Sequence, residues 1–99
     1  MDIKVEELKK RMDEGDESYI LIDVREPHEH AEYNIGGLLV PMAGIMGAMP
    51  HLSQNKDAEI IVYCRSDNRS GMIKGFLEAQ GFSNVRNLLG GMIAWEKMS

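Results

Sequence analysis

The sequence predicts an α/β domain built on a mostly parallel central sheet of about five strands, with helices on both faces. Near-continuous apolar runs at residues 19–24 and 59–63 are typical of strands that are covered from both sides. Segments whose apolar residues recur at helical spacing alternate with these runs, and only short turns separate them. Because parallel strands end at one edge of their sheet, we expect the functional residues at that edge.

Each element follows from a local pattern of residues. Val5, Leu8 and Met12 share one face of a helix. Pro27 is a favoured first residue of a helix, and a Gly-Gly pair at residues 90–91 interrupts the chain before the last one. We predict helices at residues 5–12, 27–33, 72–80 and 92–98, and strands at residues 19–24, 38–40, 59–63 and 84–89.

Residues 42–52 contain several methionines and no Asp, Glu, Lys or Arg. In one interpretation they form a helix and turn that cover the sheet, with methionine as adaptable core filler. In the other they form an apolar wall beside the functional site that receives a protein partner or an organic substrate. We favour the first interpretation.

Length and composition predict a single globular domain over residues 1–99, with 43% hydrophobic and 27% charged residues. The 16 acidic and 11 basic residues give a net charge of −5, which argues against a nucleic-acid partner. No stretch approaches the ~20 apolar residues of a membrane span, so we expect no membrane partner. The single cysteine leaves no internal disulfide, which favours the cytoplasm, although a removed leader peptide remains an alternative.

The only cysteine, Cys64, stands where the 59–63 strand gives way to a polar loop and then a helix. The free N–H groups and the dipole of that helix place partial positive charge at the loop, and Arg65 and Arg69 add donors. Such surroundings favour a nucleophilic thiolate and an anionic ligand. A lone cysteine is more often a small buried hydrophobe, but the carboxyl end of a strand favours the nucleophile.

Asp23 and Arg25 end the 19–24 strand and belong to the same sheet edge. We favour a supporting role, in which they bond each other or orient the loop, over direct contact with a substrate. His28 and His30 lie on different sides of the predicted helix, so we expect a solvated pair and no metal site.

Three motifs in this order resemble those of the single-domain rhodaneses, a sulfurtransferase family. They are Asp23-Val24-Arg25-Glu26-Pro27, Cys64-Arg65-Ser66-Asp67-Asn68-Arg69-Ser70 and Leu89-Gly90-Gly91-Met92-Ile93-Ala94-Trp95. The resemblance covers nearly the whole chain and implies a rhodanese-like fold. It also implies a sulfurtransferase that needs no cofactor.

The resemblance further implies that Cys64 takes the outer sulfur of thiosulfate or of a persulfide donor and becomes a persulfide. The sulfur then passes to cyanide in vitro or to a thiol in the cell. Arg65 and Arg69 would bind the anionic donor, Ser66 and Asn68 would supply shape and hydrogen bonds, and Ser70 would cap the following helix. The expected partners are a small anionic sulfur donor, a thiol or cyanide acceptor and a sulfur-relay protein.

Two further features of the loop bear on the chemistry. Four residues separate Cys64 from Arg69, whereas phosphatases with a similar cradle have five, so the smaller loop favours sulfur over phosphate. Asp67 replaces the family's usual glycine; aspartate can adopt a left-handed conformation, but its carboxylate comes near an anion site. The alternative function is a persulfide carrier or protein-docking module with little turnover of small donors.

Overall fold

The computed structural model describes residues 1–98; Ser99, the last residue of the expected domain, lies outside the described residues. Four strands form one parallel sheet in the order β2-β1-β3-β4. They are β1 (Ile20–Asp23), β2 (Leu38–Leu39), β3 (Ile60–Tyr63) and β4 (Val85–Asn87). A single bridge between Ile3 and Leu88 extends the pairing beyond β4. The predicted α/β fold with its parallel sheet is therefore confirmed, and every pairing between the described strands is parallel.

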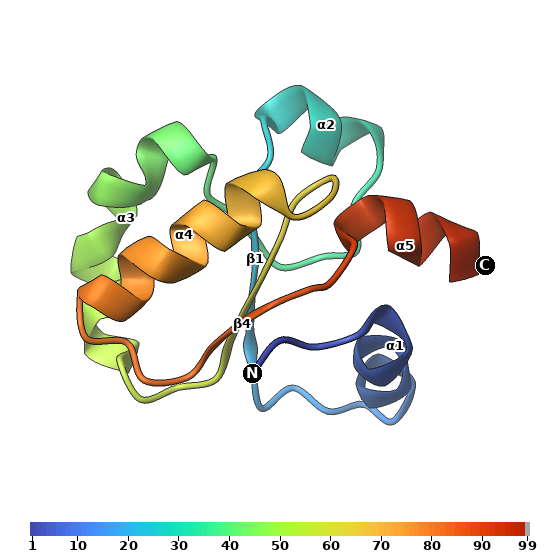
Figure 1. Cartoon of the computed structure of the whole chain (residues 1–99), viewed down its shortest axis with the longest axis horizontal. Coiled ribbons are helices and arrows are strands. Elements are labelled where there is room, and N and C mark those ends of the chain that lie inside the picture. Colours follow the sequence, from blue (N-terminus) through green and yellow to red (C-terminus); the bar gives the residue numbers. More distant parts are fainter. Residues whose placement is uncertain (99) are drawn as a thin grey trace.

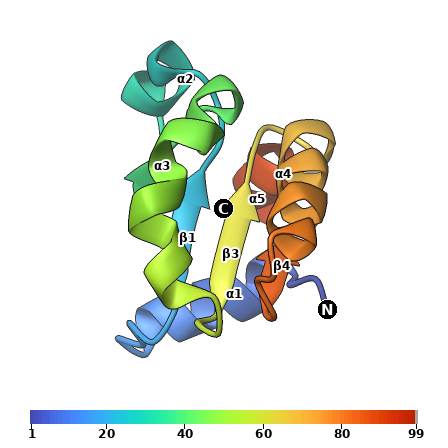
Figure 2. The same ribbon diagram turned by 90° about the vertical axis from the view of Figure 1, so that its left-hand side faces the viewer.

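Helices cover both faces of this sheet because successive strand residues point to opposite sides. Ile22 and Val62 belong to one core cluster, which α3 (Ile45–Leu52) and α4 (Asn68–Ala79) cover. Leu21 and Ile61 belong to the other cluster, which α1 (Val5–Asp13) and α5 (Gly91–Met98) cover. Figure 1 and Figure 2 show the two helix pairs on opposite sides of the strands. The short helix α2 (Pro27–Glu32) buries no residue and lies beyond the carboxyl ends of the strands.

The helix after the cysteine loop begins at Asn68, four residues earlier than the predicted start at residue 72. Its first turn is closed by the N–H of Gly71, which donates to the carbonyl of Asp67 at 2.9 Å. The first turn consists of polar residues, which show no apolar periodicity, so the sequence predicts a loop there. Arg69 and Ser70 therefore stand on a helix, which restricts the directions of their side chains.

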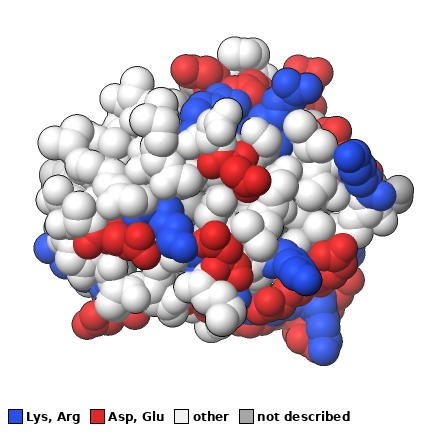
Figure 3. Space-filling model, in the orientation of Figure 1, with Lys and Arg blue, Asp and Glu red and all other residues white. Residues whose placement is uncertain are grey.

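Residues 42–52 form a 3-10 turn (Met42–Gly44) followed by α3, and a second 3-10 turn (Ser53–Asn55) follows. Ile45 and Leu52 are buried, and Met42 and Met49 pack against the same core. The favoured interpretation of this segment as core cover is thus confirmed, and Met46 is its one large apolar side chain that is exposed. Figure 3 shows an uncharged surface over α3, at the upper left of the view. No helix among residues 1–98 combines the length and apolarity needed to cross a membrane.

Candidate active site

Cys64 directly follows β3, and its side chain is buried, with 1% of its surface exposed. The Sγ atom donates to the carbonyl oxygen of Ser66 at 3.3 Å. It also accepts the backbone N–H of Ser70 at 3.4 Å and lies 3.2 Å from the hydroxyl oxygen of Ser70. The sulfur is thus enclosed by its own loop and by the first turn of α4, whose N–H groups favour a negative charge there.

A chain of hydrogen bonds leads from Ser70 to the far side of the loop. The Ser70 hydroxyl donates to Oδ1 of the buried Asn87 at 2.6 Å. Nδ2 of Asn87 donates to Oδ1 of Asp67 at 3.2 Å, and the same oxygen accepts the N–H of Gly90 at 2.9 Å. Asn87 is therefore a site residue that sequence reasoning missed, because it stands on β4, far from Cys64 in the sequence.

These bonds correct two expectations. Ser70 does not cap α4, because it is the third residue of that helix and its hydroxyl bonds Asn87 instead. Asp67, the residue before the helix, has φ −126° and is not in the left-handed region. Its carboxylate is occupied by Gly90 and Asn87, so the loop accommodates the replacement of glycine without strain.

The start of α5 holds the Cys64 loop by hydrogen bonds to its carbonyl groups. The N–H of Met92 donates to the carbonyl of Cys64 at 2.9 Å, and the N–H of Ile93 donates to that of Arg65 at 3.0 Å. Gly91 has φ +53°, and a Cβ atom there would overlap the carbonyl oxygens of Cys64 and Ser66. The sequence predicts only a break in the chain at the Gly-Gly pair. In the structure, the missing side chain of Gly91 also lets α5 approach the Cys64 loop closely.

The two loop arginines have different surroundings. Arg69 makes a two-pronged ion pair with Glu29 of α2, with N–O distances of 2.6 and 3.1 Å. The hydrogen bond from Arg69 lowers the pKa of Glu29 from its usual 4.5 to about 2, against a smaller opposing effect of burial. No local pattern in the sequence predicts this ion pair, because Glu29 and Arg69 are 40 positions apart.

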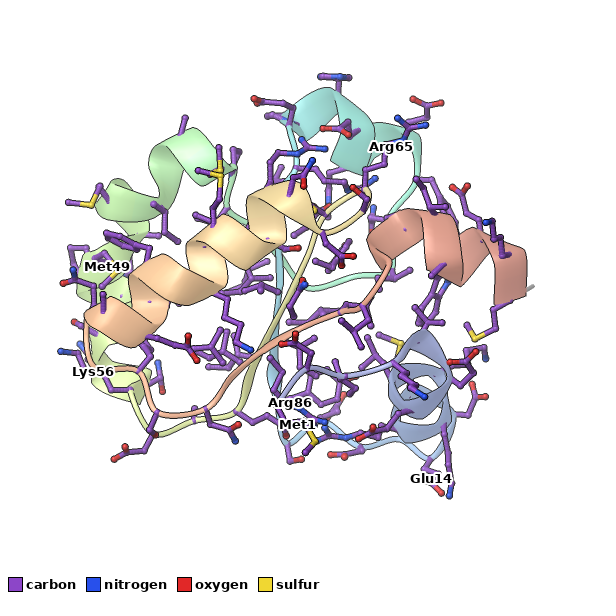
Figure 4. All side chains as sticks on the ribbon, viewed as in Figure 1. Met1, Glu14, Met49, Lys56, Arg65 and Arg86 are labelled. Atoms are coloured by element: carbon purple, nitrogen blue, oxygen red, sulfur yellow. The ribbon has the colours of Figure 1, made fainter. Side chains whose placement is uncertain are left out.

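Arg65 is exposed and lies at a pocket of about 210 Å³ between α2 and α5. Figure 4 shows Arg65 next to α2. The side chains that line this pocket are Arg25, Glu29, Glu32, Tyr33, Arg65, Met92, Ile93 and Glu96. Two arginines thus share the pocket with three glutamates, so the surroundings of Arg65 are not those of a purely cationic anion site. Asn68 is exposed at the start of α4, and Ser66 contributes its carbonyl oxygen to Cys64.

Asp23 and Arg25 bond each other at the end of β1. Nε and a terminal nitrogen of Arg25 donate to the fully buried Asp23 carboxylate at 2.9 to 3.2 Å. Burial alone would raise the pKa of Asp23, but hydrogen bonds from Arg25 and His30 outweigh it and hold that pKa below its usual value. Arg25 also donates to the carbonyl of Tyr33 at 2.7 Å, which ties the end of β1 to the end of α2.

His30 contradicts the expectation of a solvated histidine pair, because its Nδ1 lies 2.8 Å from the Asp23 carboxylate. His28 is exposed. Within residues 1–98, no three His, Cys, Asp or Glu side chains gather closely enough to hold a metal ion. A buried thiol that accepts a helix N–H, as Cys64 does from Ser70, is an arrangement that can act as a sulfur nucleophile.

Comparison with known proteins identifies relatives of the whole described chain. The family model of the rhodanese-like domain matches residues 4–98. A protein of Allochromatium vinosum named "Sulfurtransferase" is 37% identical, and the match covers 97% of this chain and 88% of that protein. "Putative sulfurtransferase YtwF" of Bacillus subtilis is 41% identical, with 96% and 89% covered. "Putative sulfur carrier protein YrkF" of Bacillus subtilis is 34% identical, and the match covers 95% of this chain but 50% of that protein.

Solved structures show the same fold. The crystal structure of a rhodanese-like domain protein from Staphylococcus aureus superimposes with a TM-score of 0.83 and is 32% identical. That superposition covers 96% of this chain and 91% of the other.

Proposed function

The chain belongs to the rhodanese-like domain family, and from this premise we propose that it is a sulfurtransferase whose carried group is a persulfide on Cys64. The donor is thiosulfate or a persulfide, and the acceptor is cyanide in vitro and a thiol in the cell. One observation carries the proposal. The sulfur of the only cysteine lies at the carboxyl end of β3, where the loop encloses it and the start of α4 donates the N–H of Ser70 to it.

In the first step the Cys64 thiolate attacks the outer sulfur of thiosulfate. A new S–S bond forms, the S–S bond of thiosulfate breaks, and its electron pair leaves on sulfite. The products are the Cys64 persulfide anion and sulfite, so the total charge is unchanged. The N–H of Ser70 supports this step because it donates to Sγ of Cys64, the atom that carries the charge of the attacking thiolate.

In the second step the acceptor attacks the outer sulfur of the persulfide. Cyanide leaves as thiocyanate and a thiol leaves as a new persulfide, while the electron pair of the broken bond returns to Cys64. The sulfur atom is itself the group transferred, so this mechanism uses no cofactor.

We assign the remaining site residues by their positions. Arg65, exposed at the mouth of the loop, binds the anionic part of the donor. Ser66, Asp67, Asn68 and Ser70 shape the cradle, and Arg69 lies at its rim in an ion pair with Glu29. Asp23 and Arg25 support the edge of the sheet from behind.

In the cell, we propose that this single domain exchanges sulfur with a relay protein in the cytoplasm. The reducing environment there keeps the Cys64 thiol free to accept sulfur. The name of the sulfur-carrier relative favours one alternative, a carrier that is loaded by another protein and does not turn over small donors.

Intact-mass measurement tests the proposal. The protein and Cys64→Ser are each incubated with thiosulfate and, separately, with 2-hydroxyethyl persulfide. We expect a gain of one sulfur atom only in the chain that retains Cys64, and removal of that sulfur by cyanide. No gain from either donor would contradict the proposal, and loading only from a persulfidated protein would favour the carrier. We expect no hydrolysis of p-nitrophenyl phosphate.

A further inference from the structure

Glu29 forms an ion pair with the guanidinium group of Arg69, which stands in the first turn of α4 after the Cys64 loop. Its two carboxylate oxygens bond the two terminal nitrogens of Arg69 at 2.6 and 3.1 Å. The carboxylate is also positioned from its own helix, because Oε1 accepts the N–H of Glu26 at 3.0 Å. The side chains of Glu29 and Arg69 are only 21% and 29% exposed. Both terminal nitrogens of Arg69 therefore already donate to a carboxylate that is held in place.

The other cation of the loop is also close to acidic side chains. Arg65 lies at the pocket that Glu29, Glu32 and Glu96 line together. By contrast, the carboxylate of Asp67 is bonded to Asn87 and to the N–H of Gly90. Glu29, one of the three glutamates at this pocket, also forms the ion pair with Arg69 in the first turn after the Cys64 loop.

We propose that Glu29 is the specificity-determining residue of this site, and that it favours organic persulfide donors over the doubly charged thiosulfate. This inference rests on the proposed sulfur transfer and specifies its donor class. Thiosulfate must place a sulfonate group beside the site, and sulfite must leave from the same place with two negative charges. The Glu29 carboxylate repels both species and already holds Arg69.

An organic persulfide, R–S–SH, avoids this repulsion at the reacting sulfur atoms. The Cys64 thiolate attacks the outer sulfur, the S–S bond breaks, and its electron pair leaves on R–S⁻. Cys64 then carries –S–SH, and the thiolate that leaves bears a single charge. The carboxylate of Glu29 remains ionised throughout the neutral range, because its pKa is about 2. The selection therefore operates at any pH at which the thiolate reacts.

Steady-state kinetics with cyanide as the acceptor test this inference. The kcat/KM values for thiosulfate and for 2-hydroxyethyl persulfide are measured for the unchanged chain, Glu29→Gln and Glu78→Gln. Glutamine retains the oxygen that accepts the N–H of Glu26 but loses the charge. Glu78→Gln is the matched control, because it removes the same charge from the exposed end of α4, the helix that carries Arg69.

We expect Glu29→Gln to raise kcat/KM for thiosulfate about tenfold or more and to change kcat/KM for the persulfide by less than about twofold. Glu78→Gln changes neither value by more than about twofold. Glu29→Asp retains the charge but shortens the side chain. We expect it to give an intermediate gain, which keeps the inference testable if the glutamine variant does not fold.

Three outcomes separate failure of this inference from failure of the proposed function. If the unchanged chain transfers sulfur but neither Glu29 variant gains with thiosulfate, the inference is overturned and the function stands. The same holds if both donors gain equally in Glu29→Gln. If the unchanged chain takes sulfur from neither donor, the proposed function itself fails.

Discussion

At the scale of single residues, Ser70 connects the sulfur of Cys64 to the interior of the protein. It is fully buried, and its N–H and hydroxyl lie against Cys64 while the hydroxyl donates to Asn87. Removing the hydroxyl would leave a buried amide oxygen without its donor. Serine at this position therefore contributes to stability as well as to the shape of the cradle.

Ser70→Ala is expected to lower the free energy of unfolding by about 1–3 kcal/mol, because Oδ1 of Asn87 loses the only hydrogen bond that it accepts within residues 1–98. Urea denaturation monitored by circular dichroism measures this loss. Ser53→Ala is the control, since the hydroxyl of Ser53 is exposed and its one bond, to the carbonyl of Pro50, is long at 3.4 Å. Equal losses in the two variants would show that the buried bond contributes nothing measurable.

At the scale of elements, the site depends on the close approach of α5 to the loop after β3. Met92 and Ile93 donate to loop carbonyls, and this approach is possible only because Gly91 has no side chain. The loop after β3 is therefore held by two helices. The first turn of α4 donates to the sulfur of Cys64, and the first turn of α5 donates to the loop carbonyls.

Gly91→Ala should lower the free energy of unfolding by more than about 2 kcal/mol and reduce sulfur transfer, because its Cβ meets backbone oxygens and its φ is +53°. Thermal unfolding and the rate of thiocyanate formation measure the two effects. Gly75→Ala, in the middle of α4, has no atom within 4 Å of its Cβ and should be neutral or slightly stabilising. A Gly91→Ala variant as stable and active as Gly75→Ala would contradict this view of α5.

At the scale of the whole molecule, buried and half-buried ion pairs tie distant segments together. Glu59, just before β3, bonds both Arg11 of α1 and Arg86 of β4 at 2.7 Å. The hydrogen bond from Arg11 lowers the pKa of Glu59 most. Burial opposes this change, and the hydrogen bond from Arg86 lowers the pKa further. Glu29 joins α2 to α4 in the same way. These carboxylates must be ionised for the pairs to form.

We expect the contribution of Glu29 to the free energy of unfolding to be fully present above about pH 5 and to be lost as the pH drops from 4.5 toward 2. The sign follows because the folded pKa of Glu29 is about 2 and the unfolded value is 4.5, so the unfolded chain binds the proton first. Urea denaturation at pH 7 and pH 3 measures the change. Glu29→Gln should lose less on acidification than the unchanged chain, by on the order of 1–2 kcal/mol. An equal loss would mean that this ion pair does not contribute.

The sequence by itself determined the order of helices and strands and the position of Cys64 at the end of a buried strand. It could do so because apolar periodicity and turn residues are local, so that residues 59–63 predict a strand whatever lies beside them. The three motifs identified the family in the same way, and the family model confirms it. Only the polar start of α4, which has no apolar period, was placed four residues late.

Tertiary structure alone decided the partners of those residues. Glu29 and Arg69 are 40 positions apart, and Ser70 and Asn87 are 17 apart. They meet because the strand order β2-β1-β3-β4 brings the ends of β1, β3 and β4 to one edge of the sheet. Periodicity along a chain carries no information on such pairings, since a charged or amide side chain is compatible with many neighbours. The positions of α2 and β4 determine which carboxylate neutralises Arg69 and which amide holds Ser70.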